Sequence, residues 1–167
     1  MSYNRRNFIK TSSLGAIAAS SLSINCQNNL SIPSEGVYMG DFADKPIKKI
    51  RAAFIGLNRG GSHLRNFATI ENTEVVALSD LYEENVKREL ERLYQYNSNT
   101  NNVKTYWGDK NKWKVMLKEV RPDVVFISTN WNNHAPMAIQ SMIDGAHAFV
   151  EVPMAVTLEE MWDIVNT

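Results

Sequence analysis

The sequence lacks the features that define several classes of protein. One cysteine among 167 residues cannot form an internal disulfide, so the core has to rest on apolar burial. The mildly apolar run over residues 14–24 is too short for a membrane span, which needs about 20 apolar residues. With 8 glycines, 5 prolines and a hydrophobic content of 44%, the chain is neither collagen-like nor intrinsically disordered. Its composition is that of a globular protein.

The neutral total charge hides an asymmetry between the first 26 residues and the rest. The only charged residues in that segment are Arg5, Arg6 and Lys10. The rest of the chain contains 15 basic and 18 acidic residues and has a net charge of −3. A body of this charge argues against nucleic-acid binding, so no nucleic-acid partner is expected. No metal site is expected either.

Residues 1–26 have the layout of a twin-arginine export signal. Arg5 and Arg6 are followed by Phe8, by Lys10 and then by a weak hydrophobic run rich in alanine and serine. The alternative is a frayed N-terminal helix with accidental arginines. We therefore expect export by the twin-arginine route and a periplasmic location.

Cys26 stands at the end of this apolar run and has two interpretations. A lipoprotein cleavage site would place a cysteine there for lipid attachment, and membrane contact is expected only through such an anchor. Asn25 is larger than the residue that normally precedes such a site, and the alternative is an inert cysteine. Residues 27–47, with Pro33, Gly36 and Pro46, indicate a linker.

From residue 48 onward the chain alternates between strand and helix patterns. Short apolar runs predict strands over residues 49–55, 74–78, 103–106, 123–128 and 146–152. Helical periodicity predicts helices over 60–70, 82–94, 110–120 and 134–144, and a capping box of Thr157 and Glu160 starts a final one. The pattern predicts an α/β fold over residues 48–167, a Rossmann-like doubly wound parallel sheet. Ligands of such sheets bind at the carboxyl ends of the strands.

A glycine-rich turn connects the first predicted strand to the first helix. In Gly56-Leu57-Asn58-Arg59-Gly60-Gly61 the spacing approaches the dinucleotide fingerprint G-x-G-x-x-G, with Asn58 at its second glycine position. A pyrophosphate would there meet backbone N–H groups and the helix dipole. The candidate phosphate-binding residues are Gly56, Asn58, Arg59 and Gly60, and the alternatives are a plain tight turn or a loop that has lost one residue.

Asp80 ends the second predicted strand, 24 residues after Gly56. A carboxylate at this point accepts hydrogen bonds from the adenosine ribose. Leu81 follows where a cation would be expected to hold a 2′-phosphate, so the predicted cofactor is NAD rather than NADP. The alternative for Asp80 is a helix cap.

The last two predicted strands also end in candidate site residues. The fourth runs into Ser128-Thr129-Asn130-Trp131-Asn132-Asn133-His134, of which Thr129, Trp131 and His134 are candidates to line the cofactor. His134 has the alternative of a surface or first-turn residue. The fifth delivers Glu151, the strongest catalytic candidate, because a carboxylate at the end of a buried strand needs partners or a task. The alternative for Glu151 is a solvated strand end. The two other histidines, His63 and His147, are expected to be structural.

These motifs together resemble the nucleotide-binding half of the Gfo/Idh/MocA family over about residues 48–167. The resemblance rests on the glycine loop and on Ser79-Asp80, Ser128-Thr129, Asn133-His134, Gly145-Ala146-His147 and Glu151-Val152-Pro153-Met154-Ala155. In most members the last motif is Glu-Lys-Pro, and its lysine assists hydride transfer at a sugar hydroxyl. Val152 occupies that position here, and Glu-Val-Pro resembles the glycoside hydrolase family 109 branch, whose known activity is α-N-acetylgalactosaminidase.

By this resemblance the cofactor is NAD and the substrate is a sugar or glycoside. That branch oxidises the sugar at C3, eliminates the glycoside, adds water and returns the hydride. The chemistry needs a base and a held nicotinamide rather than two flanking carboxylates. In this comparison Glu151 matches the position near the nicotinamide and substrate, and Asp80 matches the ribose carboxylate. The residues that match the phosphate loop are Gly56, Asn58, Arg59 and Gly60.

The resemblance implies a second, substrate-binding domain after residue 167. We therefore expect the chain to be an N-terminal fragment or a truncated product. Three hypotheses remain: the NAD-binding domain of an exported NAD-recycling glycosidase, a sugar or polyol dehydrogenase, and a domain that binds nucleotide weakly or not at all. An unfinished sheet edge invites pairing, so a homo-oligomer is also expected.

Overall fold

The computed structural model describes residues 47–96 and 102–167. The predicted export signal, Cys26 and the linker up to residue 46 lie outside the described residues. Five strands pair in parallel in the order β3-β2-β1-β4-β5. Their bounds are β1 Ile50–Ile55, β2 Thr73–Ser79, β3 Lys104–Tyr106, β4 Val124–Ile127 and β5 His147–Val150. The predicted α/β sheet is confirmed.

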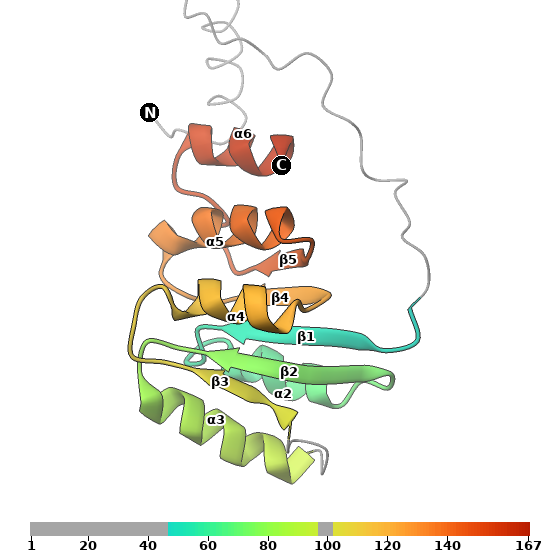
Figure 1. The fold of residues 1–167 in the computed structure, drawn as a ribbon. Coiled ribbons are helices and arrows are strands. Elements are labelled where there is room, and N and C mark those ends of the chain that lie inside the picture. Colours follow the sequence, from blue (N-terminus) through green and yellow to red (C-terminus); the bar gives the residue numbers. More distant parts are fainter. Residues whose placement is uncertain (1–46, 97–101) are drawn as a thin grey trace, which may run out of the picture. The chain divides into compact units, whose positions relative to one another are not determined.

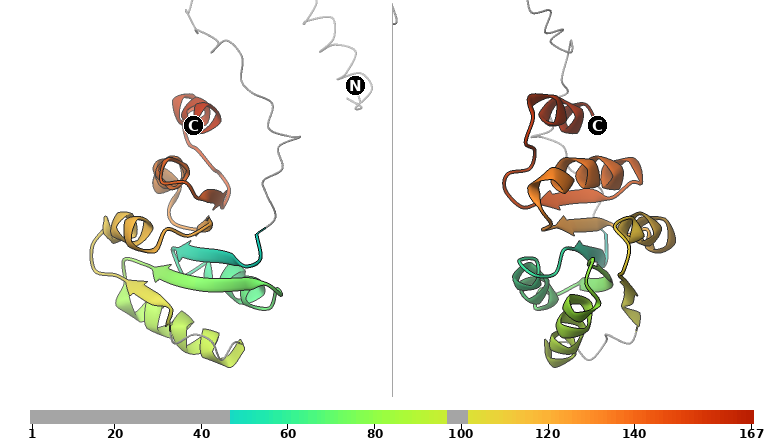
Figure 2. Two further views of the ribbon diagram at one scale, coloured as in Figure 1. Left: turned by 45° about the vertical axis from the view of Figure 1, so that its right-hand side comes forward. Right: turned by 90° about the vertical axis from the view of Figure 1, so that its left-hand side faces the viewer.

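Helices cover both faces of this sheet (Figures 1 and 2). They are α2 Gly61–Ala68, α3 Glu83–Tyr96, α4 Lys112–Val120, α5 Trp131–Ile143 and α6 Leu158–Asn166. On one face Phe54 packs with Leu64 and Phe67 of α2 and Val86 of α3. On the other face the core includes side chains of α4 and α5. Side chains at alternate positions of the strands thus pack into two separate apolar cores, one on each face, as a doubly wound sheet requires.

The carboxyl ends of β1 and β4 form the switch point of the sheet. From β1 the chain winds outward to β2 and β3, then crosses back to β4 and winds outward to β5. The connections after β1 and β4 therefore leave toward opposite faces, and a crevice opens between them. The loops that begin at Gly56 and Ser128 border this crevice.

Two predicted elements differ from the structure. The helix predicted from His134 begins at Trp131, and Pro136 lies within its second turn. The strand predicted over 146–152 ends at Val150 and is an edge strand, in which Phe149 is 57% exposed. The expectation that this strand is buried was wrong, because among the described residues β4 is the one strand that pairs with β5.

α6 packs against α5 and begins with the predicted capping box. Thr157 accepts a hydrogen bond from the Glu160 N–H, and the Glu160 side chain accepts one from the Thr157 N–H. No residue of this helix is buried. Across the ranges 47–96 and 102–167, no helix has the length and apolar character needed to cross a membrane.

Candidate functional site

A pocket of about 550 Å³ lies at the switch point. It is lined from the ends of β1, β2 and β4 and from the loop that leads into α4. The predicted site residues that reach it are Gly56, Asn58, Arg59, Asp80 and Thr129. These five candidates therefore surround one cavity, although they are up to 73 residues apart in the chain, from Gly56 to Thr129.

Two glycines make the first turn of this pocket sterically possible. Gly56 has a φ of +83°, and a Cβ there would lie 2.5 Å from the Ser128 carbonyl oxygen. At Gly60 the φ of −63° is ordinary, but a Cβ would lie 2.1 Å from the Gly56 carbonyl oxygen. Any side chain at either position would push the loop out of the crevice.

The turn leaves the N-terminus of α2 open toward the pocket. Gly60 is the N-cap residue and provides no side-chain cap, and the first turn holds no acidic residue. Asn58 and Arg59 beside it are exposed. An uncapped helix N-terminus presents backbone N–H groups and a positive dipole end, which together bind a phosphate.

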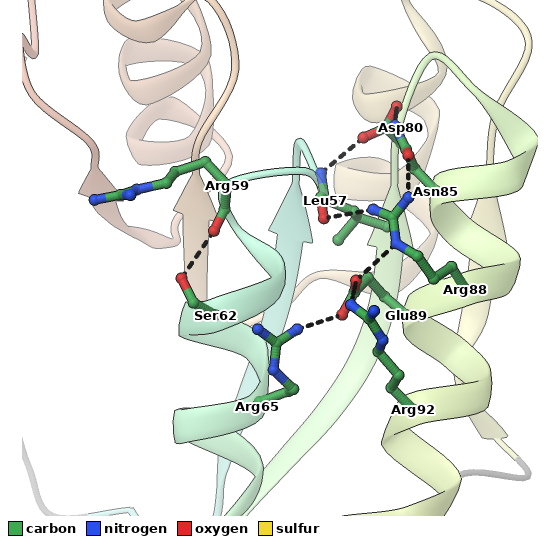
Figure 3. A network of polar contacts seen from close by, with 9 residues as sticks. All are labelled: Leu57, Arg59, Ser62, Arg65, Asp80, Asn85, Arg88, Glu89 and Arg92. Atoms are coloured by element: carbon green, nitrogen blue, oxygen red, sulfur yellow. Dashed lines mark hydrogen bonds and ion pairs between the residues drawn. The ribbon is translucent and has the colours of Figure 1, made fainter.

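Asp80 lies at the rim of the pocket and is fixed by three hydrogen bonds, of which Figure 3 shows those to Leu57 and Asn85. Its Oδ2 accepts from the Leu57 N–H at 2.7 Å. Its Oδ1 accepts from the Tyr82 N–H at 3.0 Å and from the Asn85 amide at 3.1 Å. The bond to Tyr82 spans two residues and forms an Asx turn ahead of α3, whereas the helix cap of the alternative interpretation would accept from an N–H inside the first turn of that helix. An ionised carboxylate has about four lone-pair positions, so Oδ2 keeps one for a ligand.

Trp131 and His134 do not line the pocket, unlike Thr129. Trp131 is 62% exposed at the start of α5, whereas His134 is 1% exposed. The His134 ring nitrogens lie 2.8 Å from the Pro153 carbonyl oxygen and 3.0 Å from the Thr129 carbonyl oxygen. His134 thus joins the turn after β4 to the turn after β5 and positions Thr129.

Glu151 lies at the end of β5 and is paired with a histidine. Its Oε1 is 2.6 Å from His63 Nε2 and 3.6 Å from Arg59 Nε. The hydrogen bond from His63 lowers the pKa of Glu151 below its usual value, and the charges of His63 and Arg59 act in the same direction. Glu151 is therefore an ionised carboxylate at neutral pH.

A second cavity of about 210 Å³ lies beside this pair. His63, Phe149 and Glu151 line it, and Ser128 lines both this cavity and the larger pocket. The two spaces therefore adjoin at the carboxyl end of β4. In the part of the chain that the structure describes, no three His, Cys, Asp or Glu side chains gather as a metal site would need.

Two residues of this region were not identified from the sequence. His63 was expected to be structural, yet it holds Glu151 across 88 positions of sequence. Asn85 was not singled out, although it lines the pocket and binds Asp80. The available signal for His63 was its place in the first turn of the helix that follows the glycine loop.

Comparison with known proteins gives one consistent result. Residues 50–167 match the family model described as an oxidoreductase family with an NAD-binding Rossmann fold, Gfo/Idh/MocA. The chain is 45% identical over 136 residues to glycosyl hydrolase family 109 protein 2 of Akkermansia muciniphila, covering 81% of this chain and 28% of that protein. It is 35% identical over 171 residues to the α-N-acetylgalactosaminidase of Shewanella oneidensis, covering 98% and 36%. The chain thus spans only 28% and 36% of the length of these two relatives.

Solved structures with the same fold include the scyllo-inositol dehydrogenase of Lactobacillus casei with bound NAD(H) and scyllo-inositol. The TM-score is 0.58 at 23% identity, covering 70% of this chain and 32% of that one. A similar match is the WlbA dehydrogenase of Chromobacterium violaceum with NADH and UDP-GlcNAcA, with a TM-score of 0.60 at 22% identity over 74% of this chain and 34% of that one. At these identities the match establishes the fold.

Proposed function

Because the chain belongs to the Gfo/Idh/MocA oxidoreductase family and forms its NAD-binding domain, we propose that NAD spans the pocket between Asp80 and Glu151. Within a longer protein, we propose that this domain serves an NAD-recycling glycosidase that resembles α-N-acetylgalactosaminidase. The observation that carries the second proposal is the ionised Glu151, held by His63 beside the pocket.

The residues present fit NAD. The open N-terminus of α2, with Gly56 and Gly60 keeping side chains out of the turn, suits the pyrophosphate. Asp80 has one lone-pair position left on Oδ2, which suits a ribose hydroxyl. Thr129 lines the pocket on the side of β4, next to the space that leads to Glu151.

NAD supplies reversible hydride transfer at a sugar carbon when it is bound. For such a reaction this chain contributes a fixed carboxylate: Glu151 accepts a hydrogen bond from His63 and retains acceptor positions for a sugar hydroxyl. The side chain of Glu151 is 22% exposed, which leaves it accessible to a ligand. The lysine of the ordinary dehydrogenase motif is replaced by Val152, which is 81% exposed and carries no proton to exchange.

NAD binding is the first test. Calorimetry on the purified full chain should detect NAD binding, and Asp80→Ala should weaken it about tenfold to a hundredfold, the value of a hydrogen bond to a charged group. Glu91→Ala, which removes an exposed carboxylate from α3, is the matched control and should leave the affinity unchanged. A folded chain that binds no NAD would contradict the proposal and favour a domain without nucleotide.

The proposed reaction is tested on a longer protein that contains this domain. Incubation with nitrophenyl N-acetyl-α-galactosaminide should release nitrophenol in an NAD-dependent manner without net NADH. Net NADH production from a free sugar or polyol would instead favour the dehydrogenase hypothesis. Loss of nitrophenol release in Glu151→Gln, with NAD binding retained, would support the role of the carboxylate.

Export to the periplasm is part of the same proposal and rests on Arg5 and Arg6. Cell fractionation should find the chain in the periplasm, and Arg5→Lys with Arg6→Lys should retain it in the cytoplasm. Palmitate labelling of the exported protein, lost in Cys26→Ser, would identify a lipid anchor. Without labelling, Cys26 is an inert cysteine.

A further inference from the structure

Asn85 stands between an acidic and a basic group at the rim of the pocket (Figure 3). Its amide nitrogen donates to Asp80 Oδ1 at 3.1 Å, and its amide oxygen accepts from Arg88 Nη1 at 2.7 Å. The contact with Arg88 lies on one turn of α3, because residues three positions apart share a helix face, whereas Asp80 precedes this helix. One side chain therefore fixes a carboxylate and a guanidinium at the same time.

Arg88 is held behind the pocket by further contacts. Its Nη2 donates to the Leu57 carbonyl oxygen at 3.3 Å, and its Nε lies 3.1 Å from Glu89 Oε1. The pocket is lined by Asn85 and Asp80 but not by Arg88. Arg88 is thus engaged with other acceptors rather than with the cavity.

The distribution of charge makes this arrangement selective. An adenosine 2′-hydroxyl can donate to the free position of Asp80 Oδ2, whereas a 2′-phosphate would meet the negative carboxylate. The other charged side chains of the pocket are Arg59, Lys110 and Asp109, which with Asp80 sum to no net charge. Discrimination between NAD and NADP at the ribose therefore depends on two conditions. The Asp80 carboxylate has to face the pocket, and the Arg88 guanidinium has to stay out of it.

We propose that Asn85 is a specificity-determining residue: it presents Asp80 to the ribose and withholds Arg88 from the pocket, so that the site takes NAD and rejects NADP. The proposal rests on the proposed NAD site and adds a residue that the cofactor motif does not contain. Removing the Asn85 amide takes one contact away from each group, while Asp80 keeps its bonds to Leu57 and Tyr82 and Arg88 keeps its contacts with Leu57 and Glu89. Asp80 then loses one of two hydrogen bonds at Oδ1, and Arg88 gains freedom to reach a 2′-phosphate.

The test is the ratio of NAD to NADP affinities, measured by calorimetry on the full chain. Asn85→Ala should weaken NAD about tenfold, while NADP binding stays constant or becomes tighter. The ratio should fall at least tenfold. In Asn85→Ala/Arg88→Met the NADP affinity should drop below that of the single variant, because the released guanidinium is absent. Asn85→Ser, a milder change, should shift the ratio in the same direction if alanine folds poorly.

Arg92→Met is the matched control. Arg92 binds the same Glu89 carboxylate as Arg88, at 2.8 Å, but no contact joins it to Asn85 or Asp80. It should leave the ratio unchanged, whatever it does to thermal stability. If Asn85→Ala weakens NAD and NADP by the same factor, the inference is wrong while the NAD site stands. If the folded wild type binds neither nucleotide, the proposed function itself fails.

Discussion

His63 donates a hydrogen bond from Nε2 to Oε1 of Glu151 over 2.6 Å, and this contact joins α2 to the turn after β5. A carboxylate can only accept, so Nε2 carries the proton. The bond from His63 is the largest cause of the lowered Glu151 pKa, and the backbone N–H of Val152 contributes at 3.3 Å. Partial burial of the carboxyl acts in the opposite direction.

His63→Ala should therefore raise the pKa of Glu151 toward its ordinary value. NMR titration of the Glu151 side-chain carboxyl measures this directly. Because the folded pKa is below the unfolded one, the pair stabilises the fold above the ordinary glutamate pKa, and this contribution is lost as pH falls through the lowered value. Arg59→Ala removes the smallest of the causes and should shift the pKa less. A larger shift in Arg59→Ala would contradict this order.

Gly60→Ala should displace the glycine loop. The new Cβ would lie 2.1 Å from the Gly56 carbonyl oxygen, a backbone atom that cannot turn away. We expect a loss of about 1–3 kcal/mol in the free energy of unfolding in urea, as for other overpacked sites, and NAD binding weakened at least tenfold by calorimetry. Gly108→Ala is the control, since its φ is +84° but nothing lies within 4 Å of the new Cβ. It should cost about 1 kcal/mol of backbone strain and leave NAD binding intact.

Glu89→Gln should lower the stability of the whole domain. The Glu89 carboxylate is 1% exposed and lies within 3.1 Å of nitrogens of Arg65, Arg88 and Arg92. Breaking a buried ion pair costs about 3–5 kcal/mol. These guanidinium groups are 31–47% exposed and can rehydrate, so we expect a loss of about 2–3 kcal/mol in urea unfolding.

The control for this change lies on the same helix. Glu83→Gln breaks an exposed pair with Lys87, 3.0 Å apart, and should change the free energy of unfolding by about 0.5 kcal/mol or less. Equal losses for Glu83→Gln and Glu89→Gln would mean that the arginine cluster contributes no more than a surface pair.

The fold could be predicted because its signals are local. Apolar runs such as Val124–Ile127, each followed by a helical pattern, define both the strands and their parallel pairing. The edge position of β5 had no such signal, since burial of Phe149 depends on which strands pair with it. The start of α5 at Trp131 was missed although Asn130, the residue before it, is of a type that favours the N-cap position.

The residues of the candidate site also fall into two groups, those with a local sequence signal and those whose contacts depend on the folded chain. Gly56, Gly60 and Asp80 were predicted from backbone geometry and spacing, and they line or shape the pocket. His134 was placed near it by sequence alone, but its ring bonds to two carbonyl oxygens that only the folded turns bring together. The partnership of His63 with Glu151 crosses 88 positions and depends on the folded position of α2, which brings His63 to the turn after β5.

The row of phenylalanines across the sheet gives a last prediction. Phe54 of β1 stacks on Phe126 of β4 at 4.7 Å between ring centroids, and Phe126 stacks on Phe149 of β5 at 5.0 Å. Phe54 is 1% exposed, so Phe54→Ala should cost about 3–5 kcal/mol in urea unfolding. Phe149 is 57% exposed, and Phe149→Ala should cost only about 1 kcal/mol, mainly the lost ring contact.

The outcome for Phe149 also tests the edge of the sheet in solution. A cost in Phe149→Ala close to that of Phe54→Ala would mean that another surface covers the ring, because an exposed side chain cannot lose that much burial. Sedimentation of the wild type then decides between self-association, the expected homo-oligomer, and cover from within the chain. A small cost that does not depend on protein concentration supports β5 as an exposed edge of the sheet that the structure describes.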